Sequence, residues 1–297
     1  MKILLLFNAA LIAAFIVGDA GTEINVSESA TRSQTENHTV FSADGTRIGY
    51  TKVGSGPIKV VIIHGALNSG EQWIPVATAM AEHYTSYVMD RWGRGGSESR
   101  AEYSLEREIE DIVAVLEAAG PDTYVMGHSS GAIYALEAAL SASVAGLVLY
   151  EPPLHIGRFV EDVLPSIRTA VREERFDDVV SIFLREEGQL PDSDLSALRE
   201  TPLWKPMVTL AAQSVKEWEE LAGAGLRVER YRDVVVPVLL LAGTLTMDHP
   251  SFATQELETN LPDARIVMLE GQGHGANLEA PEMVAKEVIN FIHETSQ

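Results

Sequence analysis

Residues 123–134, TYVMGHSSGAIY, join a short strand-like run to a helix through two closely spaced glycines. The run over 123–126 is rich in β-branched and aromatic side chains, which predicts a buried strand. The five residues at 127–131 match the pattern Gly-x-Ser-x-Gly. A serine on such a sharp turn exposes its hydroxyl, and the turn aims the next backbone N–H at a developing oxyanion. The pattern therefore predicts Ser129 as a nucleophile and the N–H of Ser130 as an oxyanion donor.

The rest of the chain alternates predicted strands and helices. Asp44-Gly45 predicts a hairpin turn, and short apolar runs predict buried parallel strands. Strands are predicted at 40–41, 48–50, 59–63, 87–89, 123–126, 146–150, 237–242 and 264–269, and helices at 71–83, 102–119, 131–141 and 281–293. Repeated strand–helix–strand units predict an α/β fold, with a mostly parallel sheet and helices on both faces. Functional sites in such sheets lie at the carboxyl ends of the strands.

A helix-prone insertion over 152–233 interrupts this alternation after the sixth strand. Its position predicts a helical cap, or lid, above the carboxyl edge of the sheet. The insertion is acidic and contains four large aromatic side chains, Phe159, Phe183, Trp204 and Trp218. These aromatics either pack within the cap or also line a substrate pocket, and both interpretations stay open.

Two further glycine-containing loops supply candidate site residues. His64-Gly65 follows the strand predicted over 59–63, and a turn there can present the N–H of Ala66 as a second oxyanion donor. The His64 imidazole itself is interpreted as structural. Of the eight histidines, His274 has the best position for a general base, because it stands in the glycine-rich loop at 271–275 after the last strand.

These motifs resemble those of the α/β-hydrolase superfamily, of the kind with a helical cap. The resemblance rests on His64-Gly65, on Asp-Arg-Trp-Gly-Arg-Gly-Gly-Ser at 90–97, on the nucleophile elbow at 127–131, and on Gly273-His274 followed by Glu-Ala-Pro at 279–281. It extends over residues 40–295. Together the motifs are specific for the fold and are poor guides to the substrate.

The resemblance implies an acid that orients His274 and stabilises its imidazolium. In most relatives this acid is an aspartate shortly after the penultimate strand, but a threonine and a methionine occupy those positions here. Asp248 is the nearest carboxylate to them. Glu151 is a second candidate, because it follows the strand at 146–150 and some members, certain lactonases among them, carry the acid there. We prefer Glu151 and keep Asp248 as the alternative, which could instead be a charge at the start of a helix.

Composition excludes several other classes of function. The chain holds 43 acidic and 22 basic residues, a formal net charge of −21, and no cysteine. Such an acidic chain is not expected to bind nucleic acid. Without cysteine it has no thiol nucleophile, disulfide or thiolate metal ligand. No phosphate-binding loop or metal-ligand motif is found, so we expect neither a cofactor nor a metal ion.

The N-terminus has the pattern of a secretory signal peptide. Lys2 precedes an apolar run at 3–17, and small residues follow it. The run is shorter than a typical membrane span, so we expect export to the periplasm or medium, with an uncleaved anchor as the alternative. The expected organisation is a signal peptide at 1–20, a flexible leader at 21–37, a hydrolase core at 38–151 and 234–297, and the cap at 152–233.

Taken together, the sequence predicts a secreted serine hydrolase that cleaves a carboxylic ester or lactone through an acyl-enzyme. Its negative charge favours a neutral small-molecule substrate. Two alternatives stay open: a cofactor-free perhydrolase or haloperoxidase, which uses the same triad, and a non-catalytic member that only binds a ligand.

Overall fold

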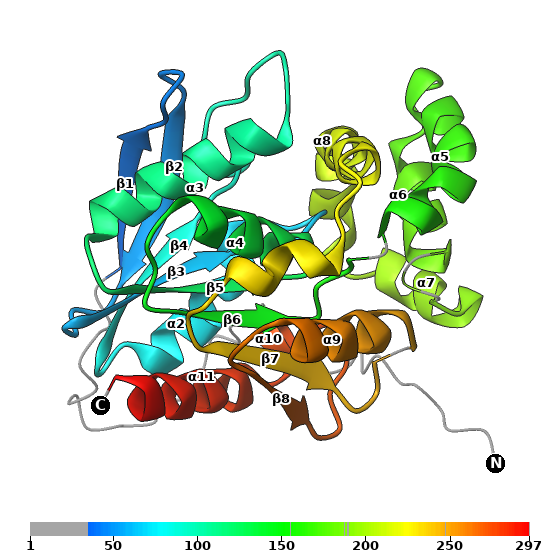
Figure 1. Ribbon diagram of the computed structural model, residues 1–297. Coiled ribbons are helices and arrows are strands. Elements are labelled where there is room, and N and C mark those ends of the chain that lie inside the picture. The colour runs from blue at the N-terminus through cyan, green and yellow to red at the C-terminus, as the bar shows by residue number, and fades with distance from the viewer. Residues whose placement is uncertain (1–34, 155, 187, 189, 247, 297) are drawn as a thin grey trace, which may run out of the picture.

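A twisted sheet forms the centre of the molecule in the computed structural model, which describes residues 35–296 except 155, 187, 189 and 247 (Figure 1). The predicted signal peptide and the leader up to residue 34 lie outside the described residues. The strands of this sheet are β1 (Thr35–Phe41), β2 (Arg47–Val53), β3 (Ile58–Ile63), β4 (Tyr84–Met89), β5 (Thr123–His128), β6 (Gly146–Tyr150), β7 (Val238–Gly243) and β8 (Ala264–Leu269).

The strand order is β1-β2-β4-β3-β5-β6-β7-β8. The hairpin of β1 and β2 is antiparallel and joins β4 in antiparallel pairing, whereas the strands from β4 to β8 pair in parallel. The parallel pairing gathers the carboxyl ends of β3, β5, β6 and β7 along one edge. This is the mostly parallel sheet that the sequence predicts.

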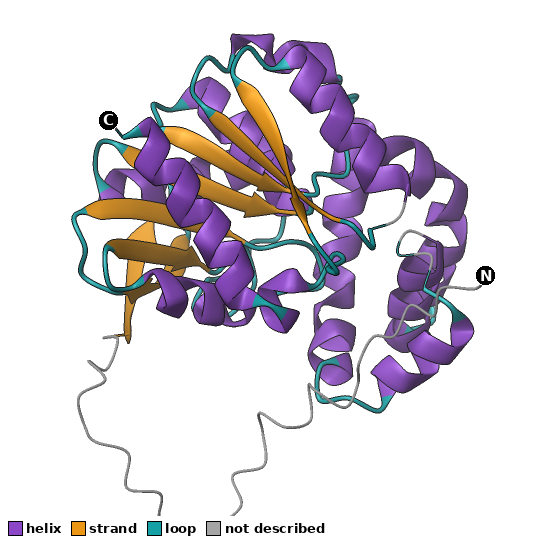
Figure 2. Cartoon of the chain, turned by 90° about the horizontal axis from the view of Figure 1, so that it is seen from below, coloured by secondary structure: helices purple, strands orange, loops and turns teal. Residues whose placement is uncertain are grey.

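Helices cover both faces of the sheet (Figure 2). On one face lie α3 (Leu105–Ala119), α4 (Ser130–Ser141) and α9 (Asp248–Asn260). On the other lie the 3-10 helix η2 (Gly70–Trp73), α2 (Ile74–Met80), α10 (Ala276–Glu279) and α11 (Pro281–Thr295). None of the helices within the described residues is long and apolar enough to cross a membrane.

Each face of the sheet has its own apolar core. In β3, Val61 and Ile63 pack on the side of α3 and α4, and Val60 and Ile62 pack on the side of α2 and α11. Burial on both faces explains why the sequences of the central strands consist of consecutive apolar residues. The core on the α3 and α4 side continues into the cap, where Trp218 is fully buried.

The cap is the helical insertion expected after β6. It contains α5 (Ile156–Arg172), α6 (Phe176–Glu186), α7 (Asp192–Arg199), α8 (Trp204–Gly223) and the 3-10 helix η3 (Val228–Asp233). Figure 1 shows α5, α6 and α7 beside the sheet, with α8 between them and the core. The aromatic ring of Phe183 stacks on that of Trp218 at 3.9 Å between centroids. These two side chains therefore pack within the cap, as one of the two interpretations predicts.

Some elements differ in extent from the sequence-based expectation. The strand β1 begins at Thr35, so the last three residues of the expected leader belong to the sheet, where Thr35 pairs with Val53. Because β1 is an edge strand with mostly exposed side chains, its polar composition resembles that of a loop. The helix predicted at 71–83 is shorter and divided into η2 and α2, with Pro75 in the first turn of α2.

Candidate active site

The Gly-x-Ser-x-Gly pattern forms a sharp turn between β5 and α4. Ser129 has φ 54° and ψ −128°, a backbone conformation that is unfavourable for any residue with a Cβ. Its N–H donates to the carbonyl oxygen of Tyr150 at 2.9 Å, which ties the turn to β6. The strained backbone and its support from the neighbouring strand fit the nucleophile elbow that the sequence predicts at Ser129.

The two glycines of the elbow allow backbone segments to approach closely. A Cβ on Gly127 would lie 2.7 Å from the backbone nitrogen of Ala132, and one on Gly131 would lie 2.6 Å from the carbonyl oxygen of His64. Both distances are shorter than a van der Waals contact. Gly131 therefore lets α4 start directly against the end of β3.

The second candidate loop lies against the elbow. A Cβ on Gly65 would be 2.9 Å from the Cβ of Ser129, so only a glycine permits this approach. In the described part of the chain, no acceptor bonds the backbone N–H of Ala66 or of Ser130. Two unbonded N–H groups near one serine are what an oxyanion hole requires.

His274 and Glu151 come together across the carboxyl edge of the sheet. The Nδ1 atom of His274 lies 2.5 Å from Oε2 of Glu151. Glu151 directly follows β6 and is fully buried, whereas the side chain of His274 is 46% exposed. The carboxylate thus reaches one nitrogen of the imidazole and leaves the other nitrogen available to the site.

Further donors fix the carboxylate of Glu151. Its Oε1 atom accepts a hydrogen bond from the N–H of Gly243 at 2.7 Å and another from the hydroxyl of Thr246. Thr246 stands at one of the positions where the resemblance implies an acid, and here its hydroxyl donates to Glu151. The sequence reasoning missed this role, although the unusual threonine at that position was its signal.

Asp248, the alternative acid, is the first residue of α9. Its side chain lies outside the part of the chain that the structure describes. The helix start at this residue agrees with the alternative interpretation of Asp248 as a helix N-terminal charge. The structure places Glu151 in contact with His274.

Two residues hold the loop that carries His274. The Nε2 atom of His128 bonds the carbonyl oxygen of His274 at 3.0 Å, and their rings lie 4.4 Å apart. Burial lowers the pKa of His128 well below its usual value, so the ring is neutral and donates from Nε2.

The hydroxyl of Tyr150 donates to the carbonyl oxygen of Gly273 and accepts from the N–H of Ala276. The sequence analysis assigned neither residue a role.

Among the described residues, no hydrogen bond links Ser129 Oγ to the ring of His274. Hydrogen bonds between a nucleophile and its base are often long in a free enzyme and tighten when the substrate is bound. No group of side chains in the described residues is arranged to hold a metal ion. The strained turn of Ser129 and the contact of His274 with Glu151 are suited to nucleophilic chemistry by a serine with a histidine base.

The family profile of alpha/beta hydrolases matches residues 60–287. The chain belongs to the alpha/beta hydrolase family. This confirms the resemblance that the motifs indicate.

Individual relatives agree with this assignment. The hydrolase is 25% identical over 256 residues to 2-(acetamidomethylene)succinate hydrolase of Mesorhizobium japonicum. The alignment covers 80% of this chain and 89% of that protein. A crystal structure of an alpha/beta hydrolase from Sphaerobacter thermophilus matches with a TM-score of 0.78 and 32% identity, covering 86% of this chain and 100% of that one. An esterase from Thermogutta terrifontis shares the fold, with a TM-score of 0.72, 17% identity and coverage of 89% and 100%.

The close packing around Gly127 should contribute to the stability of this hydrolase. We expect Gly127→Ala to lower the free energy of unfolding by about 1–3 kcal/mol, because the added methyl group overlaps backbone atoms that cannot move aside. Gly223→Ala is the matched control, since a Cβ there meets nothing within 4 Å. Urea unfolding measures both. Equal stability of Gly127→Ala and the wild type would contradict the close packing of the elbow.

Proposed function

We propose that this hydrolase cleaves a carboxylic ester or lactone through a covalent acyl-enzyme on Ser129. The observation that carries the proposal is the contact of His274 Nδ1 with the buried carboxylate of Glu151, at 2.5 Å, beside the strained turn of Ser129. The unbonded N–H groups of Ala66 and Ser130 add support, because they supply the two donors that a tetrahedral intermediate needs.

The proposed reaction follows from these positions. The hydroxyl oxygen of Ser129 attacks the carbonyl carbon, and Nε2 of His274 accepts the hydroxyl proton. The N–H groups of Ala66 and Ser130 bond the oxyanion, and Glu151 stabilises the imidazolium through Nδ1–H. When the intermediate collapses, the C–O bond to the alcohol breaks and His274 returns the proton to the leaving oxygen. Water then attacks the acyl-enzyme with His274 as the base, which releases the acid and restores Ser129.

Charge and homology bear on the substrate. The net charge of −21 disfavours polyanionic substrates, so we propose a neutral or weakly charged small molecule. The relative from Mesorhizobium japonicum is named for an acetamido compound. We therefore keep small amides as a second candidate class. The cofactor-free perhydrolase or haloperoxidase reaction and pure ligand binding are further outcomes that the tests below distinguish.

The covalent step is tested with the wild type and Ser129→Ala. We expect a fluorophosphonate probe to label the wild type only, and p-nitrophenyl acetate to be hydrolysed at least about 10³-fold faster by the wild type than by the variant. A panel of short esters, long esters, lactones and amides then defines the class, and a peracid assay with acetate and peroxide tests for perhydrolase activity. A folded wild type that is neither labelled nor active on any acyl substrate would disprove the covalent mechanism.

The identity of the acid is tested by two isosteric variants. We expect Glu151→Gln to lower kcat by about 10²- to 10⁴-fold, because an amide cannot stabilise the imidazolium of His274. Asp248→Asn removes a carboxylate of the same region and should change kcat by less than about 3-fold, since ordinary helix N-terminal charges contribute little. Steady-state kinetics on the best ester measures both. The opposite ranking would assign the acid to Asp248.

We also propose that the protein is exported, on the basis of Lys2 and the apolar run at 3–17. In a bacterial host that expresses the full chain, N-terminal sequencing of the exported protein is expected to start near residue 21. Leu11→Arg places a charge within the apolar run and should leave the protein uncleaved inside the cell. Recovery of the wild type with Met1 intact in the cytoplasm would contradict export.

A further inference from the structure

The orientation of the Ala66 N–H is set by the carbonyl group of the same peptide unit. The carbonyl oxygen of Gly65 lies 2.8 Å from Nδ1 of His64 and accepts from Nη1 of Arg91 at 3.3 Å. In a trans peptide the C=O and N–H bonds point in opposite directions. Holding the oxygen of Gly65 on the side of Arg91 therefore turns the N–H of Ala66 away from Arg91.

His64 is in the protonation state that this arrangement needs. Its Nε2 atom accepts from the backbone N–H of Arg91 at 3.2 Å, so the single ring proton is on Nδ1 and is donated to Gly65. Burial, together with the charges of Arg91 and Arg94, lowers the pKa of His64 well below its usual value. The ring is neutral, as both of its hydrogen bonds require.

The peptide unit on the other side of Ala66 is held by the cap. The N–H of Leu67 donates to the hydroxyl of Ser214 in α8 at 3.0 Å, although 147 residues separate them in the chain. Leu67 has φ 54°, an unfavourable value for a residue with a Cβ. The hydrogen bond that the N–H of Leu67 donates to Ser214 stabilises this conformation.

The same helix also holds Arg91. The Nη2 atom of Arg91 lies 2.9 Å from Glu217 of α8, and its Nε atom lies 2.7 Å from Glu108 of α3. Glu217 contacts Arg94 as well, and all four side chains are fully buried. Two positive and two negative charges thus balance one another where water cannot screen them. Ser214 and Glu217 are three residues apart, so they lie on one face of α8.

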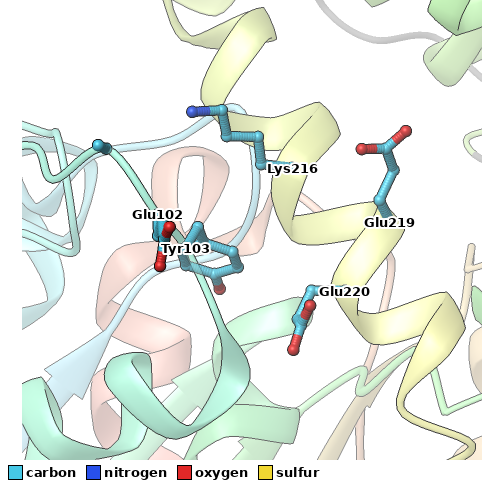
Figure 3. A pocket seen from close by; sticks show the side chains of 6 residues that line it. Glu102, Tyr103, Lys216, Glu219 and Glu220 are labelled. Carbon is cyan, nitrogen blue, oxygen red and sulfur yellow. The ribbon is translucent and has the colours of Figure 1, made fainter.

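An open, polar pocket lies between α8 and the segment that precedes α3. Figure 3 shows Lys216, Glu219 and Glu220 of α8 opposite Glu102 and Tyr103, which precede α3. The pocket has a volume of about 420 Å³. Glu220, which lines the pocket, accepts a hydrogen bond from the N–H of Leu105 at 3.2 Å. At this border α8 contacts the core through this polar bond, whereas Trp218 and Leu221 of the same helix pack in the apolar core.

We propose that α8 of the cap positions the oxyanion donor Ala66, with Ser214 and Glu217 as positioning residues. Ser214 acts directly on the peptide after Ala66, and Glu217 acts through Arg91 on the peptide before it. The stability of the oxyanion therefore depends on how the cap is seated on the core. The inference rests on the proposed function, in which the N–H of Ala66 bonds the oxyanion.

Loss of this support has a distinct kinetic signature. A tilt of the Ala66 peptide weakens a bond that is formed in the transition state, and it leaves Ser129, His274 and Glu151 where they are. Such a change lowers kcat and kcat/KM by the same factor and leaves KM unchanged. A lower stability by itself changes neither kcat nor KM as long as the variant is fully folded under the assay conditions, so kcat is compared for fully folded protein.

The test compares Ser214→Ala with Ser181→Ala. Both variants remove a buried cap hydroxyl, but Ser181 of α6 bonds Asp177 and Arg199 and does not contact the loop of Ala66. For p-nitrophenyl acetate, we expect Ser214→Ala to lower kcat by about 10- to 100-fold with KM unchanged, whereas Ser181→Ala keeps the wild-type kcat. Glu217→Gln is unsuitable as the primary variant, because it leaves two buried arginines without a full partner and is expected to impair folding.

Hydrogen exchange gives a second measurement that does not depend on turnover. The backbone amides of residues 64–68 should exchange faster in Ser214→Ala than in the wild type and Ser181→Ala. Wild-type kcat together with wild-type exchange in Ser214→Ala would overturn the inference. A wild type that fails to hydrolyse any acyl substrate would refute the proposed function instead, and the exchange rates of residues 64–68 would still decide whether α8 holds this loop.

Discussion

Parallel hydrogen bonding between β3, β5, β6 and β7 is the constraint on which the site depends. These four strands are adjacent in the sheet, so the residues that follow them meet at one edge although they are far apart in the chain. Ala66 follows β3, Ser129 follows β5, Glu151 follows β6 and Thr246 follows β7. A shift of one strand by a single residue would turn its terminal side chain to the opposite face of the sheet and dismantle the group.

Much of this arrangement can be predicted from the sequence. The apolar runs of the central strands locate the sheet, and the glycines of 127–131 locate the elbow. Both patterns are contained in a few consecutive residues, and each indicates one type of local structure. The same holds for His274, which stands in a glycine-rich loop directly after a strand. The extent of β1 is harder to predict, since an exposed edge strand has no apolar pattern to distinguish it from a loop.

Contacts between distant segments are what the sequence does not reveal. Two carboxylates follow strands of the sheet, and only the strand order and the reach of the longer side chain bring Glu151 to His274. The contributions of Thr246, Tyr150 and Ser214 are of the same kind, because each depends on a partner far away in the chain. Threonine, tyrosine and serine are also common residues, so nothing in their local sequence sets them apart.

The chain enters the cap immediately after Glu151, and this position limits which caps the sheet can carry. The residue that contacts His274 is also the last residue before the inserted segment, where two prolines follow it. A foreign cap grafted onto this sheet must therefore be joined beyond the carboxylate and must also present a hydroxyl to Leu67 from its last long helix. The cap and the site of this protein therefore cannot vary independently, because the chain enters the cap directly after Glu151 and α8 of the cap bonds Leu67.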